Sequence, residues 1–197
     1  HMTDTRKIGY LEEALQEYFP NAAIDFTKAN PDQVFDIVEH LNRAATVFPN
    51  SAEAILRIGS HDLLEPDRKS AAWNMPLRRI YPDAPRGSGV IEFNPSLVLR
   101  NRAQHRLDTM HQAMSGYAPS SMRGVGDVAD HEFMHQVDFN SGGILRRVAP
   151  LLSEYSRKGD NEAVATAGQH WLSTGSSWDP NVIRIVTPGE IPAPVSY

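Results

Sequence analysis

Residues 125–139, VGDVADHEFMHQVDF, predict a helix that carries two histidines and a glutamate in a pattern suited to metal chemistry. His131 and His135 are four residues apart, so they lie one turn apart on one face, where both imidazoles can reach a single ion. Glu132 is rotated by about 100° from that line, so its carboxylate can activate a water molecule beside the metal instead of binding the ion. The apolar residues of the segment fall on the opposite side, which is typical of a helix packed against a core.

The composition narrows the classes of protein to which this helix can belong. With 41% hydrophobic and 22% charged residues the chain can bury a core, and its lack of cysteine excludes disulfides, cysteine-ligated zinc and thiol catalysis. The net charge of -5, without a basic stripe, argues against a nucleic-acid partner. No stretch approaches the roughly 20 apolar residues of a membrane helix, and the N-terminus is amphipathic rather than signal-like. We therefore expect a soluble protein without a membrane partner.

Hydrophobic periodicity predicts an α+β fold, with a small antiparallel or mixed sheet, an active-site helix and N-terminal helices. The segments expected to be helical, besides the active-site helix, are residues 5–19, 31–45, 101–115, 144–156 and 161–173, and the expected strands are residues 54–60, 79–81 and 89–93. Asn30, Pro31 and Gln33 suit the cap, the first position and the capping box of the second helix.

The chain is expected to have three parts. Residues 3–48 form an N-terminal helical segment packed on the core, and residues 49–178 form the catalytic domain. Residues 179–197 are rich in proline and are expected to form an extended surface tail.

The segment His131–His135 resembles the H-E-x-x-H motif of the zincin metallopeptidases. The chain differs from the metzincin class, because Asp138 and Ser141 stand where that class has a glycine and a third histidine. Residues 152–165 are similar to the second half of gluzincin domains found in phage-associated proteins and in toxins of the lethal-factor type. In those domains a tyrosine precedes a glutamate ligand on a helix. The resemblance covers residues 85–175 and implies a compact zincin-type domain.

A catalytic zinc site needs three protein ligands and one open position, so a third ligand must join His131 and His135. The resemblance implies that Glu162 is this ligand. Asp160 can cap a helix and place Glu162 in its first turn, although an acidic residue also suits that turn without any metal. Asp138, His170 and Glu154 remain alternative third ligands.

Three further features each have two interpretations. The resemblance implies that Tyr155 donates a hydrogen bond to the oxyanion of the tetrahedral intermediate, but a tyrosine at a helix end can also simply pack. Asp138 is expected to orient a ligating imidazole from the second shell, the alternative being a solvated carboxylate. Residues 89–94 form either an edge strand, to which an extended peptide could add, or an ordinary core strand.

The remaining basic residues are not expected to form a site. His40, His61, His105 and His111 show no ligand spacing and are expected at the surface or satisfied in the core. Arg100, Arg102 and Arg106 are expected to form a solvated helix face, too small for a nucleic-acid site.

These observations predict a zinc-dependent metallopeptidase that hydrolyses peptide bonds in a peptide or protein substrate. Zn²⁺ would polarise the scissile carbonyl, and Glu132 would take a proton from water and pass it to the leaving amine. One alternative is a catalytically degenerate zincin-fold module, structural or binding, of a phage particle or toxin system. Another is a helical interaction domain in which the motif is accidental.

Overall fold

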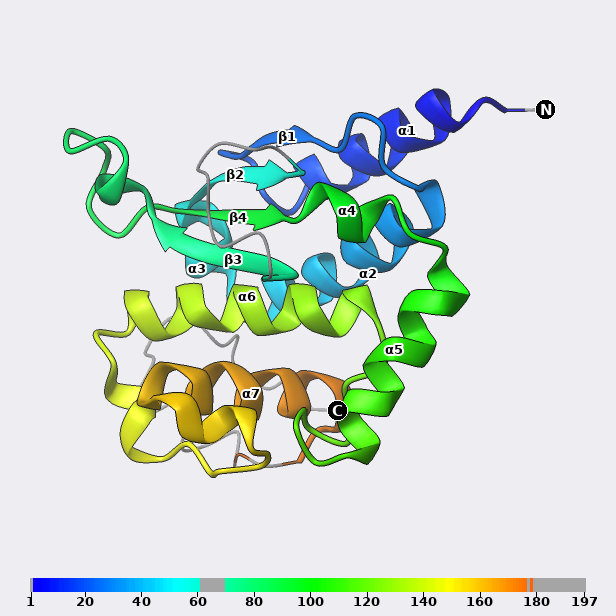
Figure 1. Cartoon of the computed structure of the whole chain (residues 1–197). Coiled ribbons are helices and arrows are strands. Elements are labelled where there is room, and N and C mark those ends of the chain that lie inside the picture. The colour runs from blue at the N-terminus through cyan, green and yellow to red at the C-terminus, as the bar shows by residue number, and fades with distance from the viewer. Residues whose placement is uncertain (1, 61–69, 177, 179–197) are drawn as a thin grey trace, which may run out of the picture.

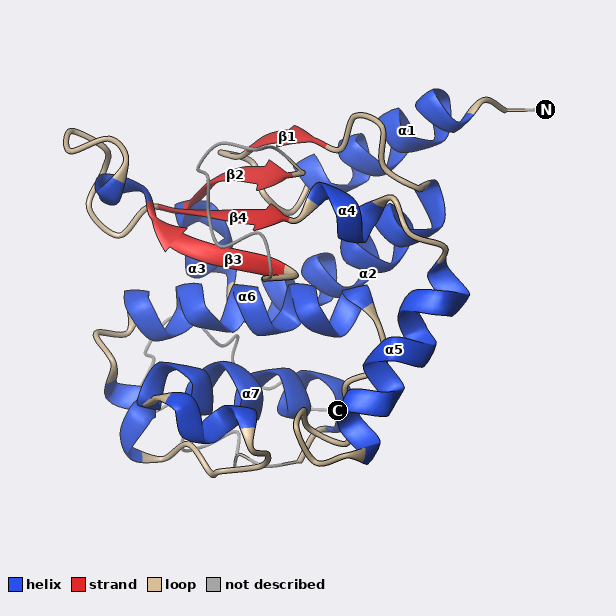
Figure 2. Cartoon of the chain, in the orientation of Figure 1, coloured by secondary structure: helices blue, strands red, loops and turns tan. Residues whose placement is uncertain are grey.

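A computed structural model describes residues 2–60, 70–176 and 178, and in it a buried helix, α6 (Val125–Asn140), lies between a sheet and a second helix, α7 (Asp160–Thr174) (Figure 1). The described part combines many helices with one small sheet (Figure 2), so the expected α+β class is confirmed. Residues 179–197, expected to form a tail, lie outside the described residues, as does His61.

The sheet has four strands, in the order β1-β2-β4-β3. Their bounds are β1 Ala23–Asp25, β2 Ile55–Gly59, β3 Ala72–Pro76 and β4 Gly89–Phe93. The first three strands in this order run parallel, and β3 runs antiparallel to β4, so the sheet is mixed as expected. Every residue of β4 is buried, because a strand lies on each side of it. The edge-strand interpretation of residues 89–94 is therefore wrong, and β3 is the edge strand beside α6.

Two short elements differ from the expected strands. Residues 79–81 are not a strand, since Leu77–Arg79 form a 3-10 helix, η1, after Pro76. The strands β1 and β3 were not expected at all. Each is short, and their side chains are mostly only half-buried, so neither shows a clear alternation of apolar and polar residues.

The N-terminal helices pack on one side of the sheet and on α6 (Figure 1). They are α1 (Asp4–Gln16), α2 (Pro31–Val47) and the short α3 (Pro49–Ala54). As expected, the Asn30 side chain caps α2 by accepting a hydrogen bond from the Asp32 N–H at 3.0 Å, and Pro31 occupies the first turn. Gln33 completes no capping box, because the Asn30 N–H that its side chain would accept donates to the Val98 carbonyl instead.

Helix α5 (Arg102–Met114) follows the short α4 (Pro95–Val98), and its orientation was not foreseen. Arg102 and Arg106 both pair with the carboxylate of Asp36 on α2, so the face expected to be solvated contacts another helix. The apolar side chains of α5 are left exposed instead. They are Leu107, Met110 and Met114. Ion pairs to α2, rather than apolar burial, therefore orient this helix.

The expected helix over residues 144–156 is wrong. The chain forms two short 3-10 helices there, η2 (Ile144–Arg147) and η3 (Tyr155–Lys158), separated by an irregular segment. Pro150 lies between them, and a proline inside a helix removes one backbone donor and clashes with the preceding turn.

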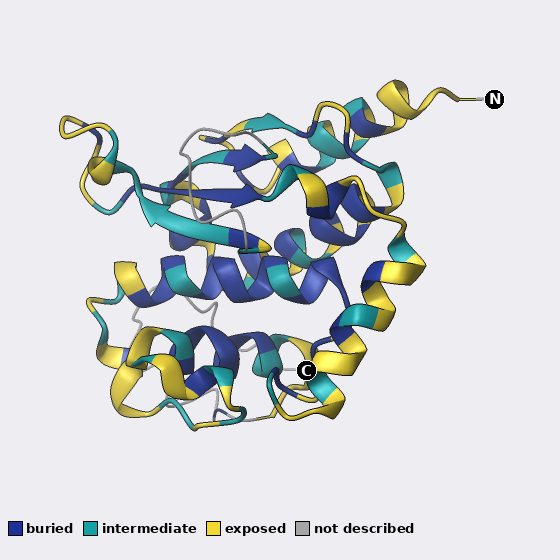
Figure 3. Cartoon of the chain, viewed as in Figure 1, coloured by how far each residue is buried: buried dark blue, intermediate teal, exposed yellow. Residues whose placement is uncertain are grey.

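A single hydrophobic core includes side chains of α1, α2, the sheet, α6 and α7. Figure 3 shows that α6 is buried along most of its length. Its Phe133 ring lies 6.0 Å from the ring of Phe19 and 6.3 Å from that of Phe48, so the helix is fixed against the N-terminal segment. Among the described helices, none is both long and apolar enough to cross a membrane.

Candidate metal centre

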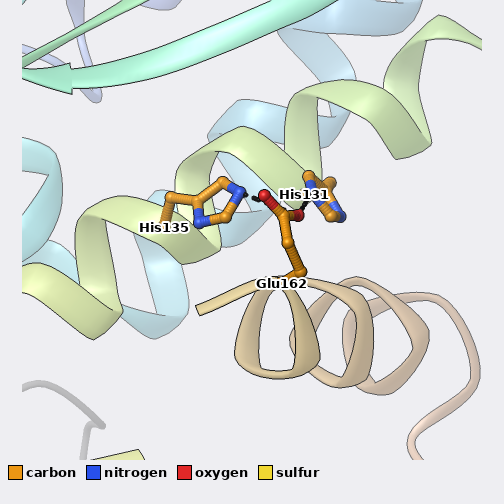
Figure 4. A group of neighbouring side chains, drawn as sticks. All are labelled: His131, His135 and Glu162. Atoms are coloured by element: carbon orange, nitrogen blue, oxygen red, sulfur yellow. Dashed lines mark hydrogen bonds and ion pairs between the residues drawn. The ribbon is translucent and has the colours of Figure 1, made fainter. Parts of the chain in front are cut away.

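Two helices bring one carboxylate against two imidazoles (Figure 4). His131 and His135 lie on one face of α6, and Glu162 lies in the first turn of α7. One oxygen of Glu162, Oε2, is 3.0 Å from Nε2 of His131 and 3.4 Å from Nε2 of His135. One ligand atom from each of the three residues lies within 4.8 Å of the other two.

Two of these separations are close to those between the ligands of a tetrahedral zinc ion. Zinc–nitrogen and zinc–oxygen bonds of about 2.0–2.2 Å at tetrahedral angles place neighbouring ligand atoms roughly 3.3–3.5 Å apart. The distances of 3.0 and 3.4 Å from the Glu162 oxygen to the two imidazole nitrogens are close to this value. Two histidines and one glutamate are also a donor set of catalytic zinc sites, with one position left open. The residues therefore fit this metal.

Close packing between α6 and α7 sets these distances. Gly168 of α7 faces Met134 of α6, and a Cβ atom at Gly168 would lie only 2.5 Å from Cγ of Met134. Met134 is fully buried and fills the space above the glycine. Because Gly168 has no side chain, Met134 can pack against the backbone of α7. The two helices therefore lie close enough for Glu162 to reach the histidines.

The charges around the three residues suit metal binding. Burial raises the pKa of Glu162, but the hydrogen bonds and the positive charges of His131 and His135 together outweigh it, so the pKa lies far below its usual value and the carboxylate is ionised. Burial lowers the pKa of His135, but the hydrogen bond with Glu162 and the nearby carboxylate of Glu132 outweigh it and raise the pKa overall. The site therefore favours positive charge, which a cation can also supply.

Glu132 is buried and does not belong to this three-residue group. Together with His131 and Tyr155 it lines a pocket of about 480 Å³ between α6, the start of β3 and η3. A carboxylate that neighbours this group and faces a pocket is placed to exchange a proton with a molecule bound there.

The Tyr155 ring lies against the same group. Its centroid is 5.7 Å from that of His131 and 5.6 Å from that of Tyr117. Burial, and then the negative charges of Glu162 and Glu132, raise the pKa of Tyr155 well above its usual value. The phenol therefore stays protonated at neutral pH and can donate a hydrogen bond into the pocket.

Asp138 does not make the contact that we expected. Its carboxylate accepts hydrogen bonds from the Arg146 guanidinium, at 2.7 Å from the terminal nitrogen and 3.0 Å from Nε. Nδ1 of His131 is buried without a hydrogen-bond partner in the described part of the chain. Asp138 therefore joins α6 to η2, because a guanidinium offers a carboxylate two parallel donors where an imidazole offers one.

The other alternative third ligands also lie elsewhere. Nδ1 of His170 is 2.8 Å from the Ser121 hydroxyl, and Nε2 of His170 is 3.2 Å from that of Ser176. Glu154 is exposed and precedes η3. Of the four residues considered as the third ligand, Glu162 is the one that the structure groups with both histidines.

A second group of three ligand atoms was missed from the sequence. Nδ1 of His40, on α2, is 2.8 Å from Oδ2 of Asp130 on α6, and Asp127 completes the group. The Arg43 guanidinium also donates to Asp130, at 2.9 Å, so a positive charge already offsets part of the negative charge of this group. His40 is thus a satisfied residue, as expected. The partners are 90 positions apart, and no local pattern could reveal them.

Two further histidines differ in burial. His111 is exposed near the end of α5, in keeping with the expected surface position. His105 is buried, and its Nδ1 has no partner among the described residues. Burial, followed by the charge of Arg100, lowers the pKa of His105, so this imidazole is neutral near pH 7.

Comparison of the chain with family models, with curated proteins and with solved structures finds no match in any of the three.

Proposed function

We propose that this chain is a zinc-dependent metallopeptidase of zincin type, with gluzincin-like ligands, that hydrolyses peptide bonds. The observation that carries the proposal is the placement of one Glu162 oxygen between Nε2 of His131 and Nε2 of His135. Chance can produce two histidines at helical spacing, but a carboxylate from a distant helix that meets both is what a three-ligand zinc site requires. His131, His135 and Glu162 would hold Zn²⁺.

The position of β3 supports a peptide as the substrate. This strand is one of the two edge strands of the described sheet, runs antiparallel to β4 and lies beside α6, where Asn74 donates a hydrogen bond to Gln136 at 3.0 Å. An extended peptide can pair with an edge strand through backbone hydrogen bonds. Ala72, at the start of β3, lines the same pocket as Glu132 and His131, so such a peptide would run along this pocket.

The proposed chemistry divides between the metal and the side chains around it. Zinc, when bound, supplies a Lewis acid that polarises the scissile carbonyl and makes water more acidic. The Glu132 carboxylate accepts a proton from the attacking water and delivers it to the leaving amine. Tyr155 donates its hydroxyl proton in a hydrogen bond to the oxygen on which negative charge develops.

Glu132→Gln tests the proposal, because it removes the base and keeps the shape of the side chain. We expect the purified protein and this variant both to carry close to one zinc per chain by elemental analysis. The variant should cleave no peptide of a mixed library that the wild-type protein cleaves. Glu154→Gln makes the same change at an exposed position and should leave cleavage unaltered.

Two outcomes would contradict the proposal in different ways. Loss of zinc from Glu132→Gln would mean that Glu132 is itself a ligand. A zinc-loaded wild-type protein that cleaves no library peptide would instead point to a degenerate zincin-fold module.

A further inference from the structure

The side chain of Lys158, which ends in an ammonium group, lines the same pocket as Glu132 and His131. Its Nζ donates a hydrogen bond to the Tyr117 hydroxyl at 2.8 Å. The same nitrogen lies 4.6 Å from the ring centroid of Tyr155 and 5.0 Å from that of Tyr117. The Tyr155 ring and the Tyr117 hydroxyl therefore restrict the position of a charge that the flexible side chain of a lysine would otherwise move freely.

This ammonium has no carboxylate partner within the described ranges. The ion pairs found there do not include Lys158, and an ammonium has three N–H donors, of which Tyr117 uses one. Lys158 is exposed, so a molecule in the pocket can reach it. A positioned cation with donors to spare is what a carboxylate binds.

A second observation points to a ligand in the same pocket. Thr166 lines it, is fully buried and has a hydroxyl oxygen without a hydrogen-bond partner in the structure as described. A threonine in a helix usually bonds its hydroxyl to a carbonyl of the preceding turn, and a buried polar group left without a partner costs free energy. A polar group of a bound molecule would satisfy this hydroxyl.

We propose that this pocket is a subsite for a carboxylate of the substrate, bound by the ammonium of Lys158 beside the scissile bond. The inference rests on the proposed function and names its substrate class, peptides with a negative charge near the cleavage point. The Tyr155 ring links Lys158 to the proposed metal site, since its centroid lies 4.6 Å from Nζ of Lys158 and 5.7 Å from the centroid of the His131 ring. Neighbouring residues of an extended peptide are about 3.3–3.6 Å apart, so we expect the charged residue within a few residues of the bond that is cut.

Arg157 offers a matched control for the charge of Lys158. It precedes Lys158 in η3, is also exposed and carries the same charge, but it lines a different pocket together with Leu151 and Glu154. A general effect of net charge on substrate attraction would appear equally when either residue is neutralised. An effect confined to Lys158 would come from the pocket.

The test uses the full chain loaded with zinc and two sets of peptides. In the first set the C-terminus is amidated, and glutamate is exchanged for glutamine at each position near the cleavage point. In the second set a neutral peptide ends in either a free carboxylate or an amide. The first set reports an acidic side chain as the source of the charge, and the second reports a chain terminus. Both are measured with the wild-type protein, Lys158→Met, Lys158→Glu and Arg157→Met.

We expect a preference for the charged peptide of about 10-fold or more in kcat/KM in one of the sets, since charge-assisted hydrogen bonds are among the stronger ones. Lys158→Met should abolish the preference, Lys158→Glu should reverse it in favour of lysine at the same position, and Arg157→Met should retain it. A preference that is absent from both sets, or that survives in Lys158→Met, would overturn the inference.

A binding measurement separates this inference from the proposed function. The affinity of the same peptides for Glu132→Gln, and for Glu132→Gln combined with Lys158→Met, is measured by titration calorimetry, which needs no turnover. The wild-type protein could cleave no peptide at all, while charged peptides still bind and their binding depends on Lys158. In that case the peptidase proposal fails and the carboxylate subsite stands. If peptides are cleaved and bound without regard to charge, only the subsite fails.

Discussion

One carboxylate oxygen of Glu162 lies 3.0 Å from Nε2 of His131, although the two residues are 31 positions apart in the chain. The same oxygen lies 3.4 Å from Nε2 of His135. Convergence of this kind depends on how α7 packs against α6, because the Gly168 backbone touches the Met134 side chain where the helices meet. The packing of two helices thus decides which of several acidic residues can serve as a ligand.

The three-residue group predicts which histidines bind zinc. His131→Ala and His135→Ala should each reduce the zinc content of the purified protein far below one per chain, because each removes one of the three proposed ligands. His40→Ala, in the second group of ligand atoms, should leave the zinc content unchanged, since Arg43 already neutralises Asp130 there. Elemental analysis distinguishes the two groups, and zinc retained by a His131→Ala/His135→Ala double variant would place the metal elsewhere.

Glu162 and Asp138 should differ in their effect on zinc affinity. Competition with a chelator should show that Glu162→Ala binds zinc more than 10- to 100-fold more weakly than the wild-type protein. A loss of 10- to 100-fold is typical when a residue outside the coordination sphere is removed. Asp138→Ala should lose less zinc affinity, because Asp138 binds Arg146 and not an imidazole. It should instead lower the free energy of unfolding, by breaking the link between α6 and η2. The reverse order of the two zinc affinities would assign the third ligand to Asp138.

Tyr155→Phe tests the hydrogen bond to the developing oxyanion. Removing one such donor typically lowers kcat by about 10²- to 10³-fold, and KM should change little because the donor acts in the transition state. The zinc content should stay the same, since the ring still packs against His131. Tyr18→Phe, at an exposed position that follows α1, serves as the control. An unchanged kcat in Tyr155→Phe would mean that Tyr155 contributes only packing and no hydrogen bond to the transition state.

Gly168→Ala should destabilise the protein, because the new Cβ would lie 2.5 Å from Cγ of Met134. Overpacking of this kind costs about 1–3 kcal/mol in the free energy of unfolding. Gly9→Ala in α1, where a Cβ would meet nothing within 4 Å, should instead stabilise the fold by about 0.5–1 kcal/mol. Denaturant titration measures both changes. Adding Met134→Ala to Gly168→Ala should remove the clash, so the two substitutions should be strongly non-additive.

The pair of His40 and Asp130 predicts a dependence of stability on pH. Burial lowers the pKa of His40, but the hydrogen bond to Asp130 and the negative charges of Asp130 and Asp127 together outweigh it, so the folded pKa lies above the usual 6.5. The stabilisation from this histidine is therefore complete below pH 6.5 and is lost as the pH rises through the folded pKa. His40→Gln should thus lose more free energy of unfolding at pH 5.5 than at pH 8.5. An equal loss at both values would show that the charge of His40 contributes nothing.

Several features of the fold and the site were predictable because they depend on residues within one or two helical turns. The spacing of His131 and His135 requires only a helix, and the structure has that helix within a residue of the expected bounds. Asn30 caps α2 because its own side chain reaches a backbone N–H two residues later. The α+β class likewise follows from a change in local periodicity along the chain.

The rest depended on contacts between distant segments. The order of the strands placed β4 inside the sheet and β3 at its edge, and backbone hydrogen bonds between separate strands set that order. The carboxylate of Asp138 pairs with the Arg146 guanidinium on the following 3-10 helix and not with an imidazole, a contact that local spacing does not reveal. The meeting of Glu162 with both histidines, and of Lys158 with two tyrosine rings, required α7 and η3 to dock on α6. The sequence by itself determined which residues could perform the chemistry, because that depends on side-chain type and helical spacing. Only the tertiary structure decided which of them meet, because packing and long-range ion pairs set those distances.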